Sequence, residues 1–188
     1  MSEFEAPATS LPADLPFAEA LELAGQWLAA WDAGELSDEV LADRVGALVS
    51  SRDGARGFFV VALTGASPLM DRLPEPLLLQ LRLAGPEVVD LTARNLAMST
   101  AMALAHGRSG DGERQLASER VQSRSRELLR QLDPAAVKLR LETLLLAARD
   151  GQGDDLAFLD RWGYDGEQRA AIAVAVNSVA EGPTEGMA

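Results

Sequence analysis

The segment from Pro86 to Gly107 constrains the fold more than any other part of this sequence. It reads PEVVDLTARNLAMSTAMALAHG, follows Gly85, and begins and ends with residues typical of helix termini. Small side chains occur on all of its sides, and a helix that is apolar all round is normally buried inside a domain. We therefore expect a central helix at about residues 86–106, surrounded by the rest of the chain.

Helix-capping residues occur at several positions in the remaining sequence. Ser37 precedes an amphipathic run, as an N-cap residue does. Asp165 with Gln168 three residues later has the spacing of a capping box before the run EQRAAIAVAVNSVA. Between such signals, apolar residues recur with helical period. The pattern predicts helices throughout.

The expected fold is all-α: a single compact domain of about eight helices, arranged as an irregular or orthogonal bundle around the central helix. We expect this domain to span residues 15–180. Residues 1–14 and 181–188 mix proline, glycine, acidic and small residues without apolar periodicity. They are predicted to be a flexible lead and a flexible tail.

One segment, FFVVALTG from Phe58 to Gly65, fits either a buried strand or a helix. Its β-branched and aromatic residues suit a strand, and periodicity cannot separate the two in so short a run. We prefer a helix from about Asp53 to Thr64, because no other segment resembles a strand that could pair with it. Gly54 and Gly57 weaken that preference.

Composition excludes several classes of protein. The chain has no cysteine, which excludes disulfides, thiolate metal sites and thiol nucleophiles. Its first basic residue is Arg44, so it lacks a basic N-terminal signal, and no apolar run approaches the ~20 residues of a membrane span. The net charge of -12 disfavours nucleic-acid binding. We expect a cytoplasmic protein with no membrane insertion and no nucleic-acid partner.

The acidic balance is not uniform, because residues 94–140 hold 9 basic and 5 acidic residues. In the helix expected up to Leu132, Arg120 and Arg124 lie at one border of the apolar face, four residues apart. Their charges repel unless an anionic group lies between them. Three interpretations remain: internal salt bridges, for which Glu127 is a nearby candidate, contact with a partner protein or second subunit, and a bound anion.

A second stripe lies on the central helix, where Arg94, Met98, Met102 and His106 follow one another at intervals of four residues. As a pocket wall, this stripe would suit an anionic or planar ligand. In the alternative interpretation the methionines fill gaps in the core, Arg94 pairs with Asp90, and His106 is favoured by the helix C-terminus.

Motifs for chemistry are missing from the sequence. It has no nucleotide-binding glycine loop, no nucleophile elbow and no metalloprotease motif. The carboxylates of the DGQGDD loop lack the spacing of a calcium-binding loop. We therefore predict no catalytic residue, no metal and no cofactor. Trp31, beside an acidic turn, is a candidate partner anchor, since tryptophan is enriched at binding hot spots.

These observations predict a non-catalytic protein-interaction protein, an adaptor, assembly or regulatory factor. Its contact candidates are Arg120, Arg124 and Trp31, and its partner is another protein or a second copy of the chain. The alternative is a small-molecule binding protein or enzyme whose pocket lies beside the central helix.

Overall fold

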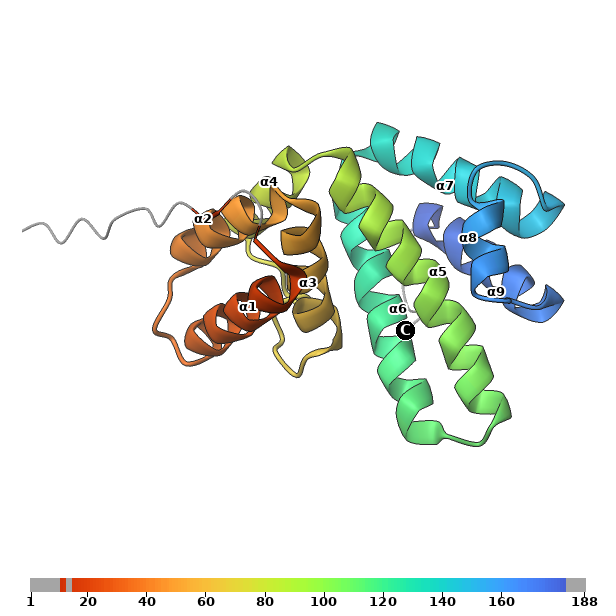
Figure 1. Cartoon of the computed structure of the whole chain (residues 1–188), viewed down its shortest axis with the longest axis horizontal. Coiled ribbons are helices and arrows are strands. Elements are labelled where there is room, and N and C mark those ends of the chain that lie inside the picture. Colours follow the sequence, from red (N-terminus) through yellow and green to blue (C-terminus); the bar gives the residue numbers. More distant parts are fainter. Residues whose placement is uncertain (1–10, 13–14, 182–188) are drawn as a thin grey trace, which may run out of the picture.

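Nine α-helices and no strand make up the part of the chain that the structure, a computed structural model, describes: residues 11–12 and 15–181 (Figure 1). The helices are α1 (Phe17–Asp32), α2 (Asp38–Val49), α3 (Arg52–Thr64), α4 (Glu75–Leu83), α5 (Pro86–Arg108), α6 (Gly112–Gln131), α7 (Pro134–Asp150), α8 (Leu156–Arg161) and α9 (Gly166–Ala180). The all-α prediction is confirmed. The segments predicted to be flexible, 1–14 and 181–188, lie outside the described residues except for 11, 12 and 181.

The helices α2 and α9 begin at the capping residues predicted from the sequence. The Ser37 hydroxyl accepts a hydrogen bond from the Val40 amide at the start of α2. Asp165 and Gln168 form the predicted reciprocal capping box before α9. Because each cap satisfies amides that would otherwise have no partner, these residues fix the helix boundaries locally.

The ambiguous segment is helical, as preferred, and forms most of α3. Phe58 and Phe59 are buried and pack edge to face, with ring centroids 5.2 Å apart. α3 contacts α1 and α2 on one side and α5 and α6 on another. The aromatic and other apolar residues of α3 therefore pack between helices from both parts of the chain, whereas the β-branched Val60 and Thr64 are exposed.

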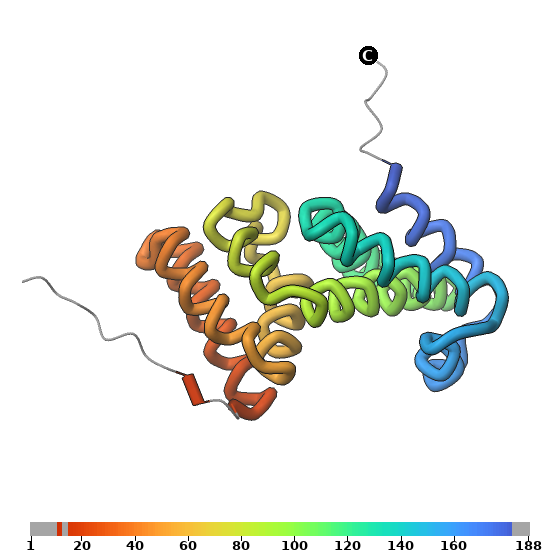
Figure 2. The backbone as a smooth tube through the Cα atoms, turned by 90° about the horizontal axis from the view of Figure 1, so that it is seen from above, coloured from red at the N-terminus to blue at the C-terminus, as the bar shows by residue number. Residues whose placement is uncertain are grey.

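Two groups of helices lie side by side (Figures 1 and 2). One group contains α1 to α4, in which α1 packs on α3 and α2 packs on both α3 and α4. The other contains α5 to α9, built on a long hairpin of α5 and α6 with α7 and α9 against α5. A continuous set of buried apolar residues runs through both groups.

The prediction of a central small-residue helix agrees with the position of α5, which packs against α3, α6, α7 and α9. Ala93, Ala97 and Ala101 are fully buried along it. Small side chains let the neighbouring helices approach closely on several sides. No helix in residues 11–12 and 15–181 is long and apolar enough to cross a membrane.

Candidate functional site

Arg124 on α6 is buried, with a side chain only 4% exposed, and holds the two groups of helices together. Its Nε and Nη2 atoms donate to the Asp71 carboxylate at 2.8 and 2.7 Å. Its Nη1 and Nη2 atoms also donate to backbone carbonyls that end α3 or follow it: Ala62, Leu63, Gly65 and Ser67, at 2.9–3.1 Å. Arg124 is thus a side-chain cap for the C-terminus of α3.

The two candidate arginines of α6 have different environments. Arg124 is occupied by internal acceptors, so its guanidinium is not available to a partner, whereas Arg120 is exposed. The anionic group near both is Asp71, 53 positions from Arg124. The hydrogen bonds from Arg124, together with the charges of Arg124 and Arg120, lower the pKa of the Asp71 carboxyl. Glu127, the partner considered from the sequence, pairs with Arg130.

At Arg94, the first residue of the stripe on α5, the structure agrees with the structural interpretation, in which this arginine pairs with Asp90. The Arg94 Nε donates to the Asp90 carboxylate at 3.0 Å, and its guanidinium lies 5.0 Å from the centroid of the Phe158 ring. Met102 is 42% exposed, and Met98 and His106 are partly buried. None of the four stripe residues lines either of the two hollows described below.

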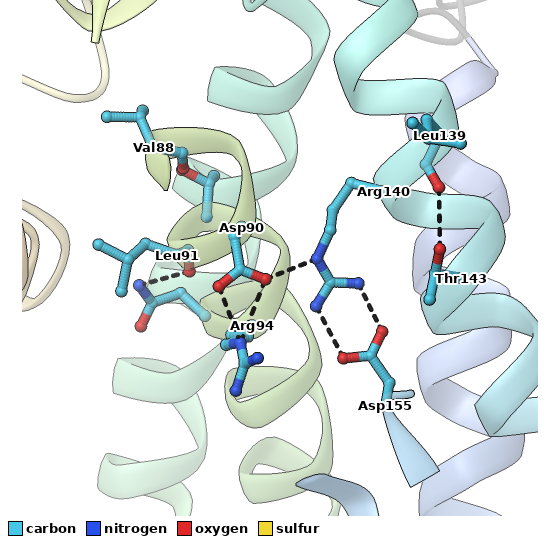
Figure 3. A network of polar contacts seen from close by, with 10 residues as sticks. Val88, Asp90, Leu91, Arg94, Leu139, Arg140, Thr143 and Asp155 are labelled. Atoms are coloured by element: carbon cyan, nitrogen blue, oxygen red, sulfur yellow. Dashed lines mark hydrogen bonds and ion pairs between the residues drawn. The ribbon is translucent and has the colours of Figure 1, made fainter. Parts of the chain in front are cut away.

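Asp90 belongs to a larger polar network that joins α5, α7 and the start of α8 (Figure 3). Arg140 on α7 donates from Nε to Asp90 at 2.6 Å and forms a bidentate pair with Asp155 at 2.5 and 2.9 Å. Burial acts to lower the pKa of Arg140, but the hydrogen bonds that Arg140 donates to Asp155 and Asp90 outweigh it and raise that pKa. Asp155, the last residue of the DGQGDD loop, is buried and held against α7 by its pair with Arg140.

Trp31 lies at the end of α1 and packs partly on the core. Its indole N–H donates to the Asp38 carboxylate at 2.8 Å, across the turn to α2. The polar atom that a partner would use is therefore already bound within the chain. The Trp31 side chain is partly exposed beside the acidic α1–α2 turn.

Two hollows open on the group of helices from α5 to α9. The larger, about 480 Å³, lies between α5, α6 and α9, and its polar lining includes Thr100, Arg108, Gln115, Glu119 and Gln122. The smaller, about 410 Å³, lies between α7 and α9 and is lined mainly by small residues with Arg149 at its edge. The larger hollow lies beside the central helix, but on a different face from the stripe beginning at Arg94.

Acidic side chains gather on α1 and α2. Residues 15–51 contain seven carboxylates and one cation, Arg44, which lies over the Trp27 ring. All seven are exposed, and none forms an ion pair in the described part of the chain: Glu19, Glu22, Asp32, Glu35, Asp38, Glu39 and Asp43. Across residues 52–181, by contrast, ten carboxylates are in ion pairs. We call the exposed carboxylates of residues 15–51 the acidic face.

Comparison with known proteins identifies a family. The family described as "Uncharacterised conserved protein UCP020893" matches residues 16–179, which include nearly every residue of the nine helices. No curated protein and no solved structure matches the chain. Since the match covers most of the sequence, the chain belongs to this family of conserved proteins.

Proposed function

We propose that the protein is a non-catalytic interaction protein, an adaptor, assembly or regulatory factor, that binds a basic protein surface through its acidic face. The observation that carries this proposal is that none of the seven carboxylates of residues 15–51 forms an ion pair with a cation in residues 11–12 and 15–181. Elsewhere in the described chain, arginines pair with the buried carboxylate of Asp155 and with several exposed carboxylates. A partner with complementary charge would supply the missing cations.

The same charge pattern defines the class of partner. Negative potential over α1 and α2 steers a positively charged surface towards it and repels phosphate groups. A protein surface rich in lysine or arginine therefore fits better than a nucleic acid or an anionic membrane. Arg120, which is exposed, remains a candidate contact on the other group of helices, and the partner is another protein or a second copy of the chain.

The experiment compares two triple variants with equal changes in net charge. Glu19→Gln, Glu35→Gln and Asp43→Asn neutralise part of the acidic face without touching Asp38, which holds Trp31. The control, Glu75→Gln, Glu113→Gln and Asp150→Asn, changes three exposed carboxylates outside it. Both variants are used for quantitative affinity purification from the native source, and native mass spectrometry reports self-association.

The proposal predicts that basic partners, or the second copy, are lost with the acidic-face variant and kept with the control. Raising the salt concentration should weaken the wild-type complex, since an exposed charged interface is screened. Equal retention by both variants would contradict the proposal.

A second candidate function is the binding of a small molecule beside α5. The observation that favours it is the larger hollow, whose volume of about 480 Å³ lies within the range of about 300–1,000 Å³ typical of ligand sites. This hollow, and not the stripe of Arg94, Met98, Met102 and His106, is where such a ligand would lie.

A further inference from the structure

The larger hollow has polar side chains whose orientations are fixed by their neighbours. Gln122 Nε2 donates to Thr100 Oγ1 at 2.9 Å. Thr100 Oγ1 itself donates its proton to the Leu96 carbonyl at 2.7 Å, so it can only accept from Gln122. The amide nitrogen of Gln122 must therefore face Thr100. Its Oε1 atom accepts no hydrogen bond from the described residues and is left as an acceptor beside the hollow that Gln122 lines.

Gln115 is oriented in the same way. Its Nε2 donates to the Glu119 carboxylate at 2.8 Å, and an ionised carboxylate can only accept. The Gln115 Oε1 atom turns instead towards α5 at Gly107, where an added Cβ would lie 3.1 Å from it. Both carboxamides that line the hollow thus have an oxygen atom that accepts no hydrogen bond from the described residues, and Glu119 adds a carboxylate.

The charges around the hollow are also predominantly negative. Arg108 is the cation among the lining residues, and its Nη1 and Nη2 atoms are bound by Asp165, at 2.6 Å, and by Glu167. These hydrogen bonds raise the pKa of Arg108. With Glu119, three carboxylates stand against one guanidinium. Two of these carboxylates already pair with Arg108, which leaves less of its positive charge available to an anionic ligand.

From this geometry we propose that the larger hollow binds a small organic cation with N–H donors. The inference rests on the second candidate function and names its ligand class. The ammonium group would donate to the oxygen atoms of Gln122, Gln115 and Glu119, as a cation with several donors can. The carbon part of the ligand would lie against Ala103, Leu104 and Ala171, which form the apolar walls.

The test titrates the full chain with three probes of similar size: phenethylamine, 3-phenylpropionate and phenethyl alcohol. Binding is followed by calorimetry and by the amide NMR signals of α5, α6 and α9. The proposal predicts saturable binding of the amine, with shifts centred on Thr100, Gln115 and Gln122, and weaker binding of the other two probes.

Two variants and one control test whether the amine binds in the larger hollow. Glu119→Gln and Gln122→Leu should each weaken amine binding at least about tenfold, because the first removes the negative charge that faces the ammonium group and the second removes an acceptor for a charged donor. Glu113→Gln removes the same charge from an exposed position of α6 outside the hollow and should leave the affinity within about twofold. Circular dichroism confirms that all three variants keep their helices.

Each other outcome overturns the proposal in a distinguishable way. Tighter binding of 3-phenylpropionate would keep the hollow as a ligand site but contradict the cationic class. No saturable binding of any probe would contradict both the ligand class and the second candidate function. An equal loss with Glu113→Gln and Glu119→Gln would show that the amine responds only to the overall negative charge.

Discussion

Individual arginines have distinct structural roles that depend on which carbonyls and carboxylates they reach. Arg124 reaches four carbonyls and one carboxylate. Arg130 reaches the carbonyls of Val179, Ser178 and Glu181 at the end of α9. In both cases a planar guanidinium with five donors satisfies helix-end carbonyls that have no partner within the helix. Such caps connect helices distant in sequence.

Replacing Arg124 with methionine should lower the free energy of unfolding by about 2–4 kcal/mol, because the carbonyls that end α3 lose their donors. Asp71 is 52% exposed and would be rehydrated, so the loss should stay below that of a fully buried ion pair. Arg120→Met, one turn earlier on the same helix and exposed, should change stability by less than about 0.5 kcal/mol. Urea denaturation measures both, and equal effects would refute this role for Arg124.

The variant Asp71→Asn tests the contact between Arg124 and Asp71 through the pH dependence of stability. The pKa of Asp71 is lowered in the folded protein by the hydrogen bonds from Arg124, so this ionised carboxylate stabilises the fold above its unfolded pKa of about 3.9. That contribution is lost as the pH falls through the lowered pKa of the folded state. The variant should be less stable than wild type by about 1–2 kcal/mol at neutral pH. The difference should shrink below about pH 4; a constant difference across pH would contradict the assignment.

At the scale of the helices, α1 and α3 approach each other closely at Gly57. Gly57 on α3 faces α1 so closely that an added Cβ would lie 2.7 Å from the Leu21 nitrogen and 2.8 Å from Ala20 atoms. Phe58, the next residue, is fully buried. Glycine is therefore required in the middle of this helix despite its low helix propensity. Gly25 on α1, by contrast, has no heavy atom within 4 Å of the Cβ position.

These two glycines make a matched pair for substitution by alanine. Gly57→Ala should destabilise the protein by about 1–3 kcal/mol, because α1 and α3 must move apart. Gly25→Ala should stabilise it by about 0.5–1 kcal/mol through higher helix propensity. Thermal unfolding of both variants measures the effects. A stabilising Gly57→Ala would show that the two helices are free to separate.

Sequence patterns gave most of the elements, because they depend on neighbouring residues. The capping box of Asp165 and Gln168 lies three residues apart, and its hydrogen bonds form within one turn. The state of the segment from Phe58 to Gly65 could not be inferred from its own residues, since its composition suits both helix and strand. Its helical state was inferred from the absence of a second strand-like segment, and the structure confirms it.

For the molecule as a whole, charge is distributed unevenly between the two groups of helices. The acidic face has seven carboxylates and one cation within residues 15–51, whereas arginines of α5 to α9 are paired across helices. Like charges repel one another most strongly where no counter-charge lies between them. The unbound protein therefore carries an electrostatic cost on α1 and α2 that a basic partner would relieve.

Salt should relieve the same repulsion. Raising sodium chloride to about 1 M shortens the Debye length to about 3 Å, so the melting temperature of the wild type should rise. This rise should be smaller in the variant Glu19→Gln, Glu35→Gln and Asp43→Asn than in the control Glu75→Gln, Glu113→Gln and Asp150→Asn. A smaller or equal salt effect in the control would contradict the assignment of the repulsion to the acidic face.

The sequence by itself determined the helices, their caps and the central place of residues 86–106, because periodicity, capping and side-chain size act over one or two turns. Tertiary structure decided which polar residues are available. Arg120 and Arg124 have the same chemistry, yet one is exposed and the other is buried against carbonyls about 60 positions away. Likewise, the larger hollow opens on a face of α5 other than that of Arg94. Contacts between distant segments depend on how whole helices pack, which no local pattern encodes.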